Sequence, residues 1–255
     1  LVVGSGVIGV VAKGAQHTSS GARARALLVT RPHRGSRTLY GLAESSDLRA
    51  TDIQTRGLEG IRFTAWHEGR AHLVELPLPG AHSALTGLRA AAVGLACGMT
   101  WDEILAGLRD PGSEARIRLK VKPGPRGTTL IDDAYNASPE STVAALNVLA
   151  EASGRKVAVL GDMLELGAGE REAHRIVGER AAQVAAVLIT VGRRARWIAE
   201  AARAHGLEAV AEVDDLAAAH TATMNAIQPG DTVLLKASLG MAFAGLVKSL
   251  VEAVD

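Results

Sequence analysis

The chain has 255 residues and a formal net charge of +1, which is enough length for one large domain or two ordinary ones. Its charges are interspersed and form no basic stripe, so a nucleic-acid partner is not expected. Aromatic residues make up only 3% of the chain, and no apolar window reaches the roughly 18 residues that a membrane span needs.

The first 75 residues are hard to assign, because Gly-, Arg- and Ser-rich stretches separate short apolar runs. Residues 1–9 match the dinucleotide-binding spacing G-x-G-x-x-G. That spacing needs a helix directly after it and an acidic residue about 20 positions on. Here residues 19–21 (Ser-Ser-Gly) interrupt any helix, and the next acidic residue is Glu44. Because an arginine such as Arg31 would favour a 2′-phosphate, an NADP-dependent oxidoreductase stays open as an alternative.

Beyond this region the apolar residues recur at helical spacing. A first helix is predicted to end near Gly98, and a second begins at Thr100, whose hydroxyl forms a capping box with the Glu103 carboxylate. His82, at the start of the first helix, either contacts a nucleotide or caps the helix, and the cap is favoured for an isolated histidine. The single cysteine, Cys97, is expected to be a small buried residue in a protein of the reducing cytoplasm.

Arginines alternate along the next predicted strand, residues 116–121, so that Arg116 and Arg118 project to one face. A guanidinium offers a planar fork of donors that suits a phosphate, although such a pair is also typical of a solvated strand face. After a turn at residues 123–127, an apolar run predicts a buried strand that leads into two aspartates.

Polar side chains follow this strand, because residues 132–136 read Asp-Asp-Ala-Tyr-Asn before Ser138 caps the next predicted helix. Ligands of open α/β sheets bind beyond the carboxyl ends of the strands. An aspartate there could accept hydrogen bonds from a ribose diol, with Tyr135 and Asn136 facing the same crevice. The alternative is a strand-to-helix loop whose Asp and Asn side chains only cap and turn the backbone.

The rest of the chain alternates strands and helices. Apolar runs predict strands at residues 156–160, 186–191, 207–213 and 232–235. Helical patterns follow at residues 170–183, 194–205 and 216–227, and from about Met241. Such alternation predicts the α/β class with a parallel, doubly wound, Rossmann-like sheet, and we place the domain boundary near Asn136. The ligand crevice is then expected between two domains.

Two loops at the carboxyl ends of these strands carry opposite charges. One offers Asp162 and Glu165 as acceptors for an ammonium or a hydroxyl group, and the other contains Lys236 and Ser238. Side by side, these loops could hold a zwitterion, whereas the alternatives are a solvated glutamate loop and a surface lysine. His174 is expected to be a surface or packing residue and not a catalyst.

Four segments, in this order, resemble the Mur peptide ligases, most strongly over residues 116–247. They are residues 131–139 (IDDAYNASP), 159–167 (VLGDMLELG), 174–178 (HRIVG) and 235–238 (LKAS). The resemblance implies an amide ligase of peptidoglycan synthesis that uses ATP and Mg²⁺ and adds D-alanyl-D-alanine to UDP-N-acetylmuramoyl-tripeptide. In such enzymes ATP phosphorylates a substrate carboxylate, and the incoming amine attacks the acyl phosphate.

The resemblance also assigns roles to single residues of this chain. The nucleotide would be bound by His82, Arg116, Arg118, Asp133, Tyr135 and Asn136. In the domain that closes over the substrates, catalytic roles fall to Lys236 and Ser238, and substrate binding falls to Asp162 and Glu165. No residue is assigned as a metal ligand.

The chain departs from the family pattern in several places. Ser83 and Thr86 stand where the family's adenine segment carries asparagine, and Leu239 stands where its Lys-Gly-Ser-Arg motif ends in arginine. Neither the phosphate loop G-x-x-x-x-G-K-[ST] nor the amino-terminal UDP-sugar domain is found. We therefore expect a monomeric carboxy-terminal piece, inactive alone, with an incomplete ATP domain at residues 1–135 and an acceptor domain at residues 136–255. The rival outside the enzymes is a non-catalytic module that binds D-alanyl-D-alanine or a protein partner.

Overall fold

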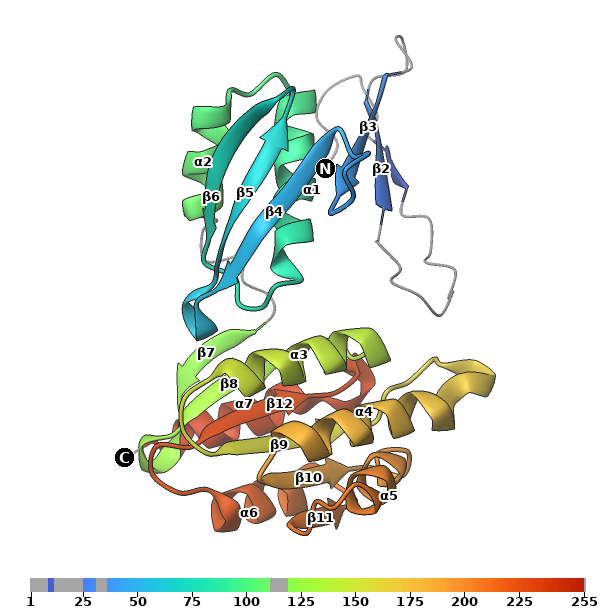
Figure 1. Cartoon of the computed structure of the whole chain (residues 1–255). Helices are drawn as coiled ribbons and strands as arrows, with labels where there is room; N and C mark the ends of the chain where they lie inside the picture. The colour runs from blue at the N-terminus through green and yellow to red at the C-terminus, as the bar shows by residue number, and fades with distance from the viewer. Residues whose placement is uncertain (1–8, 12–24, 31–35, 111–118, 255) are drawn as a thin grey trace. The chain divides into compact units, whose positions relative to one another are not determined.

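The computed structural model describes residues 9–11, 25–30, 36–110 and 119–254 (Figure 1). The chain divides into two compact units, residues 1–113 (the first unit) and residues 114–255 (the second unit). Arg31, Arg116 and Arg118 lie outside the described residues, as does most of the G-x-G-x-x-G segment. Its last glycine begins a short strand, β1 (Gly9–Val11), and does not begin a helix.

The first unit is a mostly antiparallel sheet in the order β1-β2-β3-β4-β5-β6. The strands after β1 are β2 (Arg25–Thr30), β3 (Ser36–Gly41), β4 (Leu48–Thr55), β5 (Ile61–His67) and β6 (Arg70–Leu76), with a 3-10 turn at Gly57–Glu59. Only the described pair β3 and β4 is parallel. Glu68 and Gly69 both have positive φ, at 49° and 74°, as a tight two-residue hairpin turn between β5 and β6 requires.

Two helices follow in this unit, α1 (Ser83–Ala96) and α2 (Trp101–Arg109), close to the predicted positions. The face of α1 that carries Leu88 and Ala92 is buried against the sheet, in one core with Phe63. Gly87 lets the helix approach, because a Cβ there would lie 3.1 Å from the Phe63 ring. Cys97 is exposed, so its expected burial is wrong. It is the C-cap of α1, beyond the last residue of the helix.

The second unit is a sheet in the order β11-β10-β9-β12-β8-β7, with β7 antiparallel to β8 and the other neighbours parallel. Its strands are β7 (Lys120–Pro123), β8 (Thr129–Asp133), β9 (Lys156–Gly161), β10 (Val187–Val191), β11 (Val210–Val213) and β12 (Thr232–Lys236). The doubly wound α/β class is therefore confirmed. The division between the units falls before the expected boundary at Asn136, because β7 and β8 pair into this second sheet.

Helices cover both faces of this sheet. They are α3 (Pro139–Glu151), α4 (Glu170–Val184), α5 (Arg196–Ala204), α6 (Leu216–Ala226) and α7 (Phe243–Glu252), with 3-10 turns at Pro125–Gly127, Gly167–Gly169 and Leu239–Met241. Along β9, Val157 and Val159 join one core with residues of α6 and α7. Ala158 and Leu160 are also fully buried and point to the opposite face, since side chains alternate along a strand. Right-handed crossovers place α3, α4 and α5 on that face.

Helix starts match the sequence signals closely. In α2, Glu103 N–H donates to Thr100 Oγ1, and Thr100 N–H donates to Glu103 Oε2 at 2.7 Å, which forms the predicted capping box. In α3, Ser141 N–H donates to Ser138 Oγ at 3.2 Å, and Pro139 is the first helical residue. None of the helices in the described part of the chain has the length and apolar character that a membrane crossing needs.

Removing the N-cap of α3 should have a measurable cost. Ser138→Ala leaves the Ser141 amide without its side-chain acceptor, so we expect a loss of about 1 kcal/mol in the free energy of unfolding. Urea unfolding of the whole chain measures this loss. The control is Thr221→Ala in α6, whose hydroxyl donates back to the Ala217 carbonyl within the helix and should be nearly neutral. Equal effects of both substitutions would contradict a capping role.

Candidate site at the carboxyl edge of the second sheet

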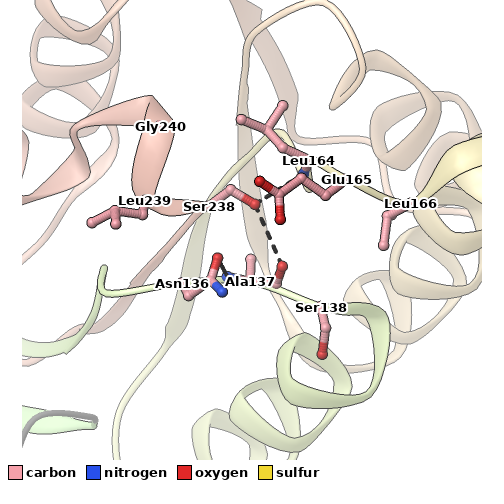
Figure 2. Close-up of a pocket in the computed structure, with 9 residues that line it drawn as sticks. All are labelled: Asn136, Ala137, Ser138, Leu164, Glu165, Leu166, Ser238, Leu239 and Gly240. Atoms are coloured by element: carbon pink, nitrogen blue, oxygen red, sulfur yellow. Dashed lines mark hydrogen bonds between the residues drawn. The ribbon is translucent and has the colours of Figure 1, made fainter.

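The carboxyl ends of β8, β9 and β12 meet at one edge of the second sheet, because these strands are parallel neighbours. A pocket of 450 Å³ opens there between the loops that follow them (Figure 2). It is lined by Asn136, Ala137, Ser138, Leu164, Glu165, Leu166, Ser238, Leu239 and Gly240. The expectation that the acidic loop and the Lys236 loop share one edge is thus correct.

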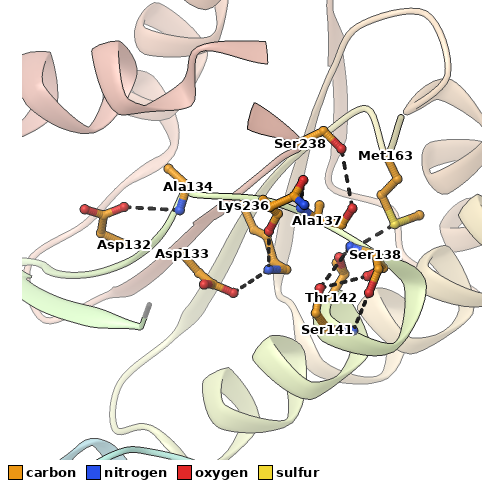
Figure 3. A network of polar contacts seen from close by, with 11 residues as sticks. Asp132, Asp133, Ala134, Ala137, Ser138, Ser141, Thr142, Met163, Lys236 and Ser238 are labelled. Carbon is orange, nitrogen blue, oxygen red and sulfur yellow. Dashed lines mark hydrogen bonds and ion pairs between the residues drawn. The ribbon is translucent and has the colours of Figure 1, made fainter. Parts of the chain in front are cut away.

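A buried ion pair lies beside this pocket. Lys236 and Asp133 are direct register partners on β12 and β8, and Lys236 Nζ pairs with Asp133 Oδ2 (Figure 3). The side chain of Lys236 is 0% exposed, and its Nζ also donates to the Asn136 carbonyl at 2.8 Å. Lys236 is therefore neither a surface lysine nor a lining residue of the pocket. It fixes the start of the loop between β8 and α3.

Ser238 joins the two loops on either side of the pocket. Leu164 N–H donates to Ser238 Oγ at 2.9 Å, and Ser238 Oγ–H donates to the Ala137 carbonyl at 3.4 Å. Ser238 N–H also donates to the Asp162 carbonyl at 3.1 Å. One buried hydroxyl thus connects the loop after β9 with the loop after β8.

Asp162 and Glu165, which sequence reasoning grouped together, face different surroundings. Asp162 Oδ1 accepts the backbone N–H groups of Arg194 and Ala195 at 2.9 and 2.7 Å, just before α5, and Asp162 is buried. Anionic side chains are favoured at helix amino ends, so this contact holds β9 to the start of α5. Glu165 is exposed, lines the pocket and has the left-handed φ of +64°. Such a backbone is uncommon for a residue other than glycine and persists only where its surroundings hold it in place.

His174 lies on α4, is completely buried, and holds the loop that follows β9. Its Nδ1 lies 2.7 Å from the Glu170 carbonyl, and Met163 N–H donates to its Nε2 at 3.0 Å. Since the carbonyl only accepts, the proton is on Nδ1 and the ring is neutral. Burial lowers the pKa of His174. The nearby Asp162 and Glu170 carboxylates act in the opposite direction and raise this pKa, but the net shift is downward. The sequence predicted packing but gave no sign of the bond to Met163.

Comparisons with known proteins bear on this site. Residues 117–239 match the family model described as Mur ligase, glutamate ligase domain. This domain belongs to the Mur ligase family. The UDP-N-acetylmuramoyl-tripeptide–D-alanyl-D-alanine ligase of Mycobacterium leprae is 34% identical to the chain over 246 residues, which cover 88% of the chain and 47% of that protein. The enzyme of the same name from Escherichia coli is 34% identical over 233 residues, which cover 86% of the chain and 48% of the protein.

A crystal structure of MurF from Acinetobacter baumannii superposes with a TM-score of 0.73 and 29% identity, covering 84% of this chain and 46% of that one. The resemblance to the Mur ligases is therefore confirmed. The chain spans about half the length of the curated relatives that it matches.

The remaining residues assigned by the resemblance are spread over the structure. In the Mur ligase domain, Asn136 is exposed and lines the pocket, and Tyr135 is 51% exposed. Asp133 is nearly buried and bonded to Lys236. His82 belongs to the first unit, where it is exposed at the N-cap of α1. Among the described residues, no group of three or more His, Cys, Asp or Glu side chains is arranged to hold a metal ion.

Proposed function

We propose that this chain is part of an ATP- and Mg²⁺-dependent amide ligase that adds D-alanyl-D-alanine to UDP-N-acetylmuramoyl-tripeptide in peptidoglycan synthesis. The observation that carries the proposal is the 34% identity to dipeptide-adding ligases over 88% of the chain. The pocket at the carboxyl edge of the second sheet supports it, because open α/β sheets bind ligands at that edge. The second unit, residues 114–255, would be the acceptor domain, and the first unit, residues 1–113, would be part of the ATP-binding domain.

Mg²⁺ and the phosphates of ATP are assigned to the complete ligase and not to the described residues of this chain. The sequence contains no G-x-x-x-x-G-K-[ST] loop, and the described residues form no cluster of three or more His, Cys, Asp or Glu side chains that could hold a metal ion. In the complete ligase, ATP would activate the carboxylate of the tripeptide. Asp133 remains our candidate for the contact to the ATP ribose, and Tyr135 and Asn136 remain candidates for positions near the nucleotide.

The contribution of this chain would be to hold the dipeptide. Among the lining residues that the structure describes, Glu165 alone has an ionisable side chain, and we assign its carboxylate to the dipeptide ammonium. The apolar side chains of Leu164, Leu166 and Leu239 would contact the methyl groups. Fixing an amine next to an acyl group lowers the entropic part of the barrier, and closing the site keeps water from the acyl phosphate.

Binding of the dipeptide tests this assignment. We expect isothermal titration calorimetry of the chain with D-alanyl-D-alanine to give a dissociation constant that Glu165→Gln weakens about fivefold, since an exposed ion pair contributes about 1 kcal/mol. Glu208→Gln is the matched control, because Glu208 is an exposed glutamate at the opposite edge of the sheet, before β11. Equal affinity of the wild type and Glu165→Gln would contradict the role of Glu165.

A non-catalytic binding module is the rival, and the sequence without a phosphate loop favours it for the chain taken alone. Both readings predict dipeptide binding. They differ when the purified chain is mixed with the amino-terminal half of one of the dipeptide-adding relatives, so that the two pieces together can form a complete ligase. Release of ADP on adding both substrates supports the ligase, and dipeptide binding without any ADP release supports the module.

A further inference from the structure

Residues 164–166 form one wall of the pocket, and this loop, beginning at the buried Met163, is held by side chains from two distant elements. Met163 N–H donates to His174 Nε2 on α4, and the next amide, Leu164 N–H, donates to Ser238 Oγ after β12 (Figure 3 shows Met163 and Ser238). The following residue, Glu165, has the left-handed φ of +64°. A strained backbone persists only where its surroundings fix it, so these two bonds set the direction of Glu165.

The bond from Met163 depends on the protonation state of His174. Both ring nitrogens are engaged, with Nδ1 donating to the Glu170 carbonyl and Nε2 accepting from Met163. A protonated ring would carry a donor on Nε2 and point it at the Met163 N–H, which is also a donor. Either the loop would then have to move or the ring would have to turn. Turning is hindered because the ring packs edge-on against the Trp197 ring, with 5.7 Å between the ring centroids.

Charged groups from three elements face this ring. Asp162 follows β9, Glu170 begins α4 and Arg194 precedes α5. The carboxylates favour the protonated form, whereas the guanidinium and, more strongly, burial favour the neutral form. At neutral pH the neutral ring therefore dominates, and the pocket wall has the described form.

We propose that His174 is a positioning residue of this pocket: its neutral ring fixes the Met163 amide and thereby the direction of Glu165, and protonation of the ring releases this wall. His174 touches no ligand in this scheme and acts through the loop. The consequence for dipeptide affinity rests on the proposed function, whereas the consequence for the loop does not.

The first test measures the loop directly, by hydrogen exchange of the Met163 and Leu164 amides in the whole chain. His174→Phe keeps a ring against Trp197 but loses the acceptor, so the protection of the Met163 amide should fall about tenfold, the equivalent of one hydrogen bond. His174→Gln offers an oxygen that can accept from Met163 and should keep the protection within about threefold. Unchanged protection in His174→Phe would overturn the proposal.

The second test is a pH profile of the same protection and of dipeptide affinity. In the wild type, amide protection and dipeptide affinity should both decline only as the pH falls below 6.5, the ordinary pKa of histidine, because the pKa of His174 is lowered. His174→Gln cannot be protonated and should remove this decline. His205→Gln is the matched control, since His205 Nδ1 also bonds a carbonyl four residues back, Ala201 at 2.9 Å, and it should leave the decline intact.

The outcomes separate the two proposals. If the wild type does not bind the dipeptide at all, the assignment of the pocket fails, and the amide protection still decides the role of His174. If His174→Phe does not fold, the pH profiles of the wild type and of His174→Gln decide it. A decline that persists in His174→Gln would show that another group is responsible.

Discussion

Replacing Lys236 by methionine should destabilise the second unit by about 3–5 kcal/mol, because the substitution leaves the Asp133 carboxylate buried without its lysine. Urea unfolding of the chain measures the loss. Lys248→Met is the matched control, since the Lys248 side chain is 77% exposed and its ion pair with Glu252 is a surface pair worth less than about 1 kcal/mol.

A double-mutant cycle separates the ion pair from simple loss of packing. Adding Asp133→Asn to Lys236→Met removes the buried charge as well, so part of the lost stability should return. The interaction energy from the cycle would then clearly differ from zero. A loss below about 1 kcal/mol for Lys236→Met, or strictly additive effects, would contradict a buried ion pair at this sheet edge.

Gly178→Ala should destabilise the chain by about 1–3 kcal/mol, because α4 and α5 are in close contact at this glycine. An added Cβ would lie 2.3 Å from the Ile198 carbonyl oxygen and 2.7 Å from the Ala201 Cβ, so the helices would have to separate. The Ile198 carbonyl belongs to the backbone of α5, so it cannot rotate away as a side chain could. The change is measured as a shift in the urea midpoint of the whole chain.

The control for Gly178 has the opposite expected sign. Gly245 lies in the exposed face of α7, and a Cβ there has no neighbour within 4 Å. Gly245→Ala should therefore stabilise the chain by about 0.5–1 kcal/mol through the higher helix propensity of alanine. If Gly178→Ala also stabilises the protein, the result would contradict a close contact between α4 and α5 at Gly178.

Gly178 and Lys236 fall in two of the four segments that carry the family resemblance. In residues 174–178, His174 holds the Met163 amide and Gly178 permits the approach of α5. In residues 235–238, Lys236 and Ser238 connect the loops around the pocket. Residues of both segments thus support the backbone around the pocket.

The sequence by itself determined the features that depend on residues a few positions apart. The capping box at Thr100, the N-cap at Ser138 and the strands and helices after residue 139 lie close to where they were predicted. Caps and apolar periods depend on side chains within about a turn of helix or a few residues of strand, so they can be read along the chain.

Only the tertiary structure decided which strands are neighbours. Nothing local indicates that β12 lies between β9 and β8, and this order is what pairs Lys236 with Asp133 across 103 residues. The antiparallel strands before residue 75 and the exposure of Cys97 were also not predicted. Strand order and burial result from the packing of distant segments around one core, and such packing leaves no periodic trace in the sequence that a local pattern could reveal.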